Sequence, residues 1–185
     1  MNLNKKQIAQ ALEWWGQIID ASLLPDWDSL PEIELYMDQV ITVIDKYLKA
    51  YSIEKNLTPS MINNYVKNKI MPAPLKKRYG KKHIAYLIMI CFFKQTLSIS
   101  TIQKIAPYDM DDEEIKKLYK SFVTNQNTAY RYVTGQIKNV ADPIIESATE
   151  EAERAYDFFM QVSISANIFK HLTEKLAALS EKEEF

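Results

Sequence analysis

Glycine is rare in this chain, with three glycines in 185 residues. Tight β-turns usually need glycine, so such a low number argues against a fold built from hairpins. The seven prolines fall mostly between segments in which apolar residues recur every three or four positions. That spacing is the period of an amphipathic helix. The sequence therefore predicts an all-α protein made of long helices.

The same periodicity places the individual helices. We expect helices over about 4–22, 35–51, 58–69, 81–96 and 111–136, with a short one within 98–105. Thr58 is placed to cap the third helix, with Pro59 at its first position. Asp142 and Pro143 are expected to open a last helix, which would be the longest.

Charge is distributed very unevenly along the chain. Residues 55–108 contain ten Lys or Arg and no Asp or Glu, whereas the remainder has thirteen basic and twenty-four acidic residues. The formal net charge of −1 therefore conceals a strongly basic segment. Such a segment should hold a positive potential that attracts polyanions.

The basic segment also contains a helix with a polar outer face. At 100° per residue, Ser60, Asn63, Asn64 and Lys67 point away from the apolar face of helix 58–69. A helix fits the DNA major groove, where Asn can pair with adenine, and nearby cations can neutralise phosphates. We expect a helix-turn-helix in which these four residues face the bases. The residues expected at phosphates are Lys76, Lys77, Arg78, Lys81 and Lys82, together with Tyr65, for which core packing is an equally open alternative.

Residues 57–105 resemble the DNA-binding domain of the MerR family. The resemblance rests on Tyr65 followed by Ile70-Met71-Pro72, on Arg78-Tyr79, and on Leu97-Ser98 followed by Ile102. It implies a winged helix-turn-helix with at most a small two-stranded wing. It also implies that Tyr65 and Arg78 contact the DNA backbone and that Tyr79 anchors the wing. Asn63 and Lys69 replace the Arg and the Gly usual in that family.

Residues 30–105 are more similar still to an uncharacterised Gram-positive bacterial family, domain of unknown function 1836, itself thought to be MerR-like. The similarity is carried by Leu30-Pro31, by Tyr36–Val40 and by Met61–Lys67. We expect an N-terminal helix and connection over 1–29, the DNA-binding domain over 30–108, and a C-terminal helical region over 109–185.

Apolar residues recur every seven positions in the C-terminal region. Paired helices bury such a repeat, either within one chain as a bundle or between two chains as a dimer. MerR-like proteins dimerise through a helix after the DNA-binding domain, which favours a homodimer. The residues expected at its interface are Ile145, Ala152, Phe159, Val162 and Phe169.

Several classes of protein do not fit the sequence. One Cys and two His cannot supply a four-ligand zinc site, and there is no phosphate-binding glycine loop or paired nucleophile and base. We therefore expect no enzyme, metal or cofactor. The chain shows neither a secretory signal nor an apolar run long enough to span a membrane, so we expect a cytoplasmic, nucleoid-associated protein. A small-molecule effector site among the C-terminal aromatic residues stays open.

Together these features predict a transcriptional regulator that binds specific double-stranded DNA as a homodimer. The main alternative is a protein-interaction module, in which the helix-turn-helix docks an acidic partner protein. An RNA-binding role is less favoured, because no aromatic residues line the basic face for base stacking.

Overall fold

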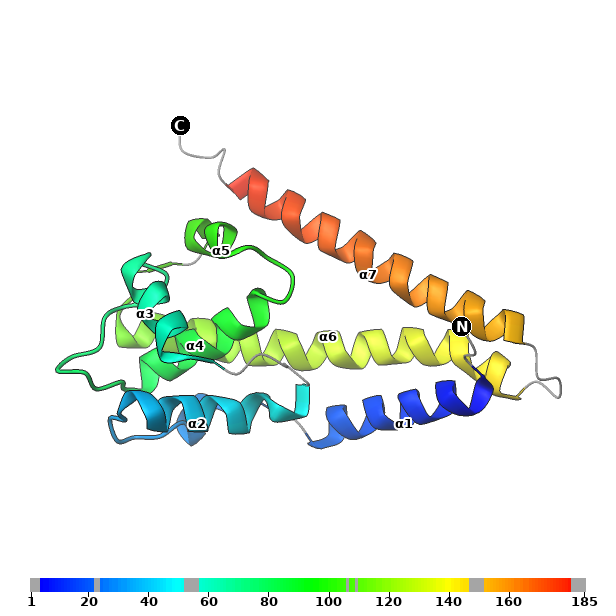
Figure 1. The fold of residues 1–185 in the computed structure, drawn as a ribbon, viewed down its shortest axis with the longest axis horizontal. Helices are drawn as coiled ribbons and strands as arrows, with labels where there is room; N and C mark the ends of the chain where they lie inside the picture. The colour runs from blue at the N-terminus through cyan, green and yellow to red at the C-terminus, as the bar shows by residue number, and fades with distance from the viewer. Residues whose placement is uncertain are drawn as a thin grey trace. The chain divides into compact units, whose positions relative to one another are not determined.

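A computed structural model describes residues 4–21, 24–51, 57–105, 107–108, 110–146 and 152–180. This part of the chain forms seven α-helices, which Figure 1 labels. They are α1 (Lys5–Ala21), α2 (Met37–Leu48), α3 (Pro59–Lys67), α4 (Lys81–Phe93), α5 (Ile99–Ile105), α6 (Asp112–Glu146) and α7 (Ala152–Ser180), with short 3₁₀ helices at Trp27–Ser29 and Lys49–Tyr51. Within these residues, β structure is limited to the isolated bridges Leu35–Tyr79 and Leu75–Arg78. The prediction of an all-α protein is confirmed.

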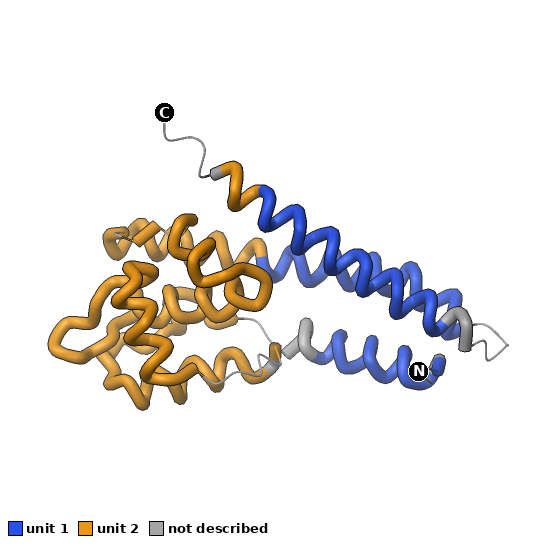
Figure 2. The backbone as a smooth tube through the Cα atoms, turned by 45° about the horizontal axis from the view of Figure 1, so that its top comes forward, with its two compact units in different colours: residues 1–23, 126–175 blue, residues 24–125, 176–185 orange. Residues whose placement is uncertain are grey.

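The helices form two compact units, coloured separately in Figure 2. One contains residues 1–23 and 126–175, and the other contains residues 24–125 and 176–185. This division differs from the expected domain boundaries, since residues 109–125 belong with the central segment. The reason is that Ile115, Tyr119 and Val123 of α6 are buried in the core of that unit.

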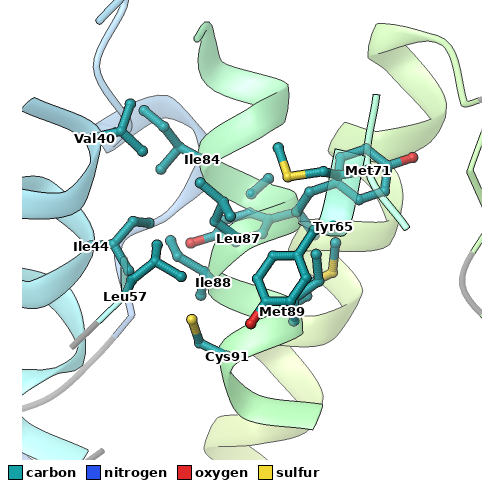
Figure 3. Close-up of a cluster of buried hydrophobic side chains, with 14 of the residues drawn as sticks. Val40, Ile44, Leu57, Tyr65, Met71, Ile84, Leu87, Ile88, Met89 and Cys91 are labelled. Carbon is teal, nitrogen blue, oxygen red and sulfur yellow. The ribbon is translucent and has the colours of Figure 1, made fainter. Parts of the chain in front are cut away.

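The core of the unit containing residues 24–125 is built around α4. Every residue of α4 from His83 to Cys91 is buried, because this helix is apolar around most of its circumference. Figure 3 shows Val40 and Ile44 of α2 beside α4, together with Leu57, and Tyr65 and Met71 packed elsewhere on the same helix. Helix α4 is therefore the central element of this core.

Local hydrogen bonds fix where α6 begins. The Asp111 carboxylate accepts from the backbone N–H groups of Glu113 (2.9 Å) and Glu114 (2.8 Å), and the Glu114 carboxylate accepts from the Asp111 N–H (2.9 Å). This reciprocal cap satisfies N–H groups that have no partner within the helix. The acidic first turn also complements the helix dipole.

In the other unit, α1 packs against the later part of α6. The Trp15 ring lies on the Tyr130 ring with centroids 5.3 Å apart, and Trp15 Nε1 donates to Thr134 Oγ1 at 2.9 Å. Ile8 is buried with Ala141. Trp14 is 49% exposed, so Trp15 makes the packing contact between the two helices.

The predicted start of the last helix is wrong. Helix α6 continues through Pro143 to Glu146 instead of ending before it, and it is longer than α7. A proline inside a helix removes one backbone hydrogen bond. Continuing the helix, however, places Ile144 and Ile145 against the cluster around Ile8. Ile145 thus contributes to the packing of α6, and the seven-residue repeat does not run along one helix from that position.

Helix α7 carries several exposed apolar side chains. Of the predicted interface residues on this helix, Phe159, Val162 and Phe169 are 40%, 37% and 57% exposed. Among the described residues, no helix combines enough length and hydrophobicity to cross a membrane.

Candidate nucleic-acid interface

Helix α3 is fixed by local interactions at both ends. At its start, the Thr58 hydroxyl accepts from the Met61 N–H at 3.2 Å, and Pro59 occupies the first turn, as predicted. At its end, the Ile70 N–H donates to the Tyr65 carbonyl (2.9 Å) and the Lys69 N–H to the Val66 carbonyl (3.1 Å). Lys69 has φ of 53°, so it takes the left-handed position that glycine usually fills at a helix end.

The two faces of α3 separate as the sequence predicts. Ile62 and Tyr65 are buried, and Met61 and Val66 are half-buried. The side chains exposed to solvent include the four that we expect to face DNA bases: Ser60, Asn63, Asn64 and Lys67. This outer surface contains no carboxylate.

The two asparagines differ in their hydrogen bonding. Asn68 Nδ2 donates to both Asn64 Oδ1 and the Asn64 carbonyl, each at 2.9 Å. Asn63 makes no side-chain hydrogen bond to any residue that the structure describes. Pairing with adenine requires a free amide oxygen as well as a free amide N–H. Asn63 is therefore the better placed of the two to read a base.

A tight turn at Leu75–Arg78, here called the wing turn, follows α3. The Arg78 N–H donates to the Leu75 carbonyl at 2.8 Å, and the turn is held to the domain by the paired backbone bonds of Leu35 and Tyr79. Lys76 and Lys77, the two central residues, have φ of 50° and 64°. Turns with two such residues strongly prefer Asn-Gly, because a Cβ is crowded in this conformation.

The lysines at the wing turn are thus poorly suited to its backbone. Left-handed backbone costs an ordinary L-residue about 1–2 kcal/mol. Both side chains are exposed and, within the described residues, form no ion pair. Packing and ion pairing therefore do not account for lysine at either position. Backbone strain retained at exposed residues is a reason to look for a function there.

Arg78 is held in place by an aromatic residue that the sequence analysis did not single out. Its guanidinium lies 4.5 Å from the centroid of the Tyr36 ring, and Nη2 donates to the Tyr36 hydroxyl at 2.8 Å. Arg78 has no carboxylate partner in the described part of the chain, so its charge is oriented but not neutralised. Because Tyr36 lies 42 residues earlier, no local pattern could have identified it.

Lys81 and Lys82 are not free cations, as the prediction of phosphate contacts assumed, because each has a carboxylate partner. Lys81 pairs with Glu32 and lies 5.9 Å from the Trp27 ring, and Lys82 lies 3.3 Å from an Asp112 oxygen. Both carboxylates lie outside the acid-free segment in sequence but next to it in space. The Lys82–Asp112 pair is exposed, and such pairs contribute only about 0–1 kcal/mol, so a phosphate would compete with Asp112 for Lys82. The Lys81 side chain is only 17% exposed, which makes it the less accessible of the two lysines.

Of the two places open to Tyr65, the core and the phosphate backbone, the structure puts its ring in the core, and Tyr79, which is expected to anchor the wing, is buried as well. They are 2% and 3% exposed, and burial raises the pKa of Tyr65 to about 12. Their rings belong to the core, which leaves little side-chain surface for a phosphate. Tyr65 supports α3 from beneath, and Tyr79 joins the wing turn to Leu35 through its backbone.

His83 and Cys91 are also structural. His83 Nδ1 accepts from the Gly80 N–H at 3.0 Å and Nε2 lies 3.4 Å from the Ala73 carbonyl, so the ring links the start of α4 to the segment before the wing turn. Burial is the main cause that lowers the pKa of His83 below its usual value. The Cys91 thiol is buried, and burial raises its pKa to about 11.

Comparison with known proteins gives one match. Searches of curated proteins and of solved structures found no significant similarity. A family described as a domain of unknown function (DUF1836) matches residues 25–122. That range contains α2 to α5, the wing turn and the first part of α6. More than half of the chain matches, so this protein belongs to the DUF1836 family.

Proposed function

We propose that this protein is a transcriptional regulator that binds specific double-stranded DNA. The observation that supports this most strongly is the combination of a carboxylate-free polar face on α3 with exposed, strained lysines at the wing turn. In this proposal α3 enters the major groove, and the unit takes the arrangement of a MerR-like winged helix-turn-helix. The phosphate backbone would meet the wing turn beside it.

The residues divide into two groups by chemistry. Asn63 reads a base edge, with Ser60, Asn64 and Lys67 beside it in the groove. Lys76, Lys77 and Arg78 contact phosphates without reading sequence. Lys81 and Lys82 join them only when they exchange their carboxylate partners for phosphate.

The proposal includes a homodimer formed through α7. Apolar residues that point to one side of this helix recur at spacings of four, seven, three, four and three, which resembles the pattern of a two-stranded coiled coil with one polar position at Ser165. They are Phe158, Val162, Phe169, Leu172, Leu176 and Leu179, of which the last five are at least 37% exposed. A two-fold dimer would place two α3 helices on a pseudo-palindromic site.

A binding titration tests the proposal. The full-length protein is titrated into a fluorescent random duplex at salt concentrations between about 50 and 200 mM. We expect the logarithm of the binding constant to fall linearly with the logarithm of salt. Arg78→Gln should reduce that slope by about one, whereas Lys117→Gln, an exposed lysine outside α3 and the wing turn, should leave it unchanged.

The rival function is docking of an acidic protein on the same surface. It is favoured by Ile33 and Leu75, which are both 71% exposed and would supply apolar contact beside the basic residues. The titration separates the two functions if it is repeated with a labelled polyglutamate peptide. Salt-insensitive or absent duplex binding, together with tight peptide binding, would replace the DNA proposal with this one.

A further inference from the structure

A pocket lies inside the unit that contains α3. It is partly open to solvent, is lined mainly by α4, α5 and the first part of α6, and has a volume of about 330 Å³. Ile70, Ile90 and Ile102 line it and are themselves fully or almost fully buried. Ser121 and Asn125 of α6 also line the pocket and are exposed to solvent, so they mark its opening.

The lining selects a small and mostly apolar molecule. Apart from Ser121, Asn125 and the Tyr86 hydroxyl, which already donates to the Pro107 carbonyl at 2.8 Å, the lining side chains carry only carbon or sulfur. Water in a cavity needs two to four polar partners, which this interior does not offer. The volume is at the low end for ligand sites and suits on the order of ten non-hydrogen atoms.

The opening and the walls narrow the ligand class further. Asn125 Nδ2 donates to Ser121 Oγ at 3.3 Å, which leaves the Asn125 amide oxygen able to accept from a ligand N–H or O–H. The Phe93 and Phe122 rings lie edge to face with centroids 5.8 Å apart. Aromatic rings pack favourably against such edges and faces. A planar aromatic molecule with one hydrogen-bond donor fits this arrangement.

The pocket also touches the end of α3. Ile70 lines it, and the Ile70 N–H makes the 2.9 Å bond to the Tyr65 carbonyl that closes α3. Any molecule packed against Ile70 therefore acts on the backbone that ends this helix. No other side chain of α3 or of its closing turn lines the pocket.

We propose that this pocket binds a small aromatic molecule with one hydrogen-bond donor, and that its occupation changes the affinity of α3 for DNA. Binding of the molecule to the pocket does not depend on the proposed function, whereas its effect on DNA affinity rests on that function. Linkage makes the coupling reciprocal: the factor by which the ligand changes DNA affinity equals the factor by which DNA changes ligand affinity.

Binding is tested with indole and 2-naphthol on the full-length protein, whose isoleucine methyl groups are ¹³C-labelled. The probes should shift the signals of Ile70, Ile90 and Ile102 with a dissociation constant below about 1 mM. They should leave the signal of Ile44, a core residue of α2 that does not line the pocket, unchanged. If neither probe shifts the three pocket signals, the pocket proposal is overturned.

Two matched variants locate the binding. Ser121→Phe fills the opening from an exposed position and should abolish the shifts. Lys117→Phe adds the same ring one turn earlier, at an exposed position that does not line the pocket, and should preserve them. Equal shifts in both variants would mean that the probes bind elsewhere. Methyl spectra without probe confirm that each variant is folded.

Coupling is tested by duplex titration with and without saturating indole. We expect at least about a fivefold change in DNA affinity that disappears in Ser121→Phe. DNA binding that indole does not change would overturn the coupling and leave the pocket intact. Methyl shifts with no duplex binding at all would instead refute the proposed function and the coupling that rests on it.

Discussion

Replacing Lys76 and Lys77 by Asn and Gly should make the protein more stable and a weaker DNA binder. The two positions have φ of 50° and 64°, where Asn-Gly is strongly preferred. Relief of the left-handed strain should contribute about 1–2 kcal/mol per residue. The greater freedom of Gly in the unfolded chain offsets about 0.5–1 kcal/mol of that gain. For the two positions together, the net expectation is about 1–3.5 kcal/mol of added stability.

Both consequences can be measured on the same sample. For a chain of 185 residues, the added stability should raise the melting temperature by about 2–14 °C. Loss of two phosphate contacts should reduce the slope of log K against log salt by about 1.8. Lys117→Gln with Lys138→Gln is the control, because it removes the same charge from exposed positions on α6.

The opposite signs of the two effects make this a stringent test. A lower melting temperature would show that the turn is not strained by its lysines. An unchanged salt slope, or an equal loss of slope in the control, would show that these two side chains do not contact phosphate. The first result would remove backbone strain as support for the proposed interface, and the second would remove the wing turn from it.

Three further outcomes are expected. Asn63→Ala should cost about 1–3 kcal/mol of binding free energy at one base pair of the site, and Asn64→Ala should cost less, because Asn64 Oδ1 already accepts from a neighbour. Competition with single-base duplex variants measures both costs. Equal losses on scrambled DNA would contradict base reading. Tyr36→Leu should weaken binding to all duplexes without changing the salt slope, because the Arg78 charge stays but loses its orientation. Anisotropy titrations measure both quantities. A reduced slope would mean that the Arg78 charge itself no longer contacts the DNA. Folding lowers the pKa of His83, so the unfolded state binds more protons below about pH 6.5 and the free energy of unfolding should fall as the pH decreases from there. Urea titrations at several pH values should show that this pH dependence is lost in His83→Gln. A pH dependence that persists in the variant would have its origin in other groups.

The structure agrees best with the sequence predictions where a short stretch of chain determines it. Thr58 and Pro59 mark the start of α3, and the helical period separates Ile62 and Tyr65 from Asn63. Each of these features depends on residues within one or two helical turns. The all-α class follows from the same local signals, and the buried α4 follows from its nearly continuous apolar sequence.

The errors arose where contacts connect distant parts of the chain. The acid-free segment places Lys81 and Lys82 among the expected phosphate contacts, but Glu32 and Asp112 reach them from outside that segment. Pro143 suggested a helix start, yet packing of the residues after it keeps α6 continuous. Tertiary packing outweighed the local preference in each case.

The sequence also does not predict the backbone strain at the wing turn. Adjacent lysines in a polar connection carry no sign of left-handed backbone, which only the turn geometry reveals. The pocket beside Ile70 was likewise unpredictable, because its lining comes from several separate helices and loops. The open alternative of an effector site was assigned to the C-terminal aromatic residues, of which only Phe122 lines this pocket.

Selection of binding sites from random duplexes by the full-length protein tests the central claim most directly. If α3 reads bases while the wing turn grips phosphates, the selected pool should converge on a consensus with two related half-sites. Asn63→Ala should relax the preference at one position in each half-site, and the wing-turn variant should keep the consensus at lower affinity. A pool that shows no enriched sequence, with the protein still folded, would contradict the account.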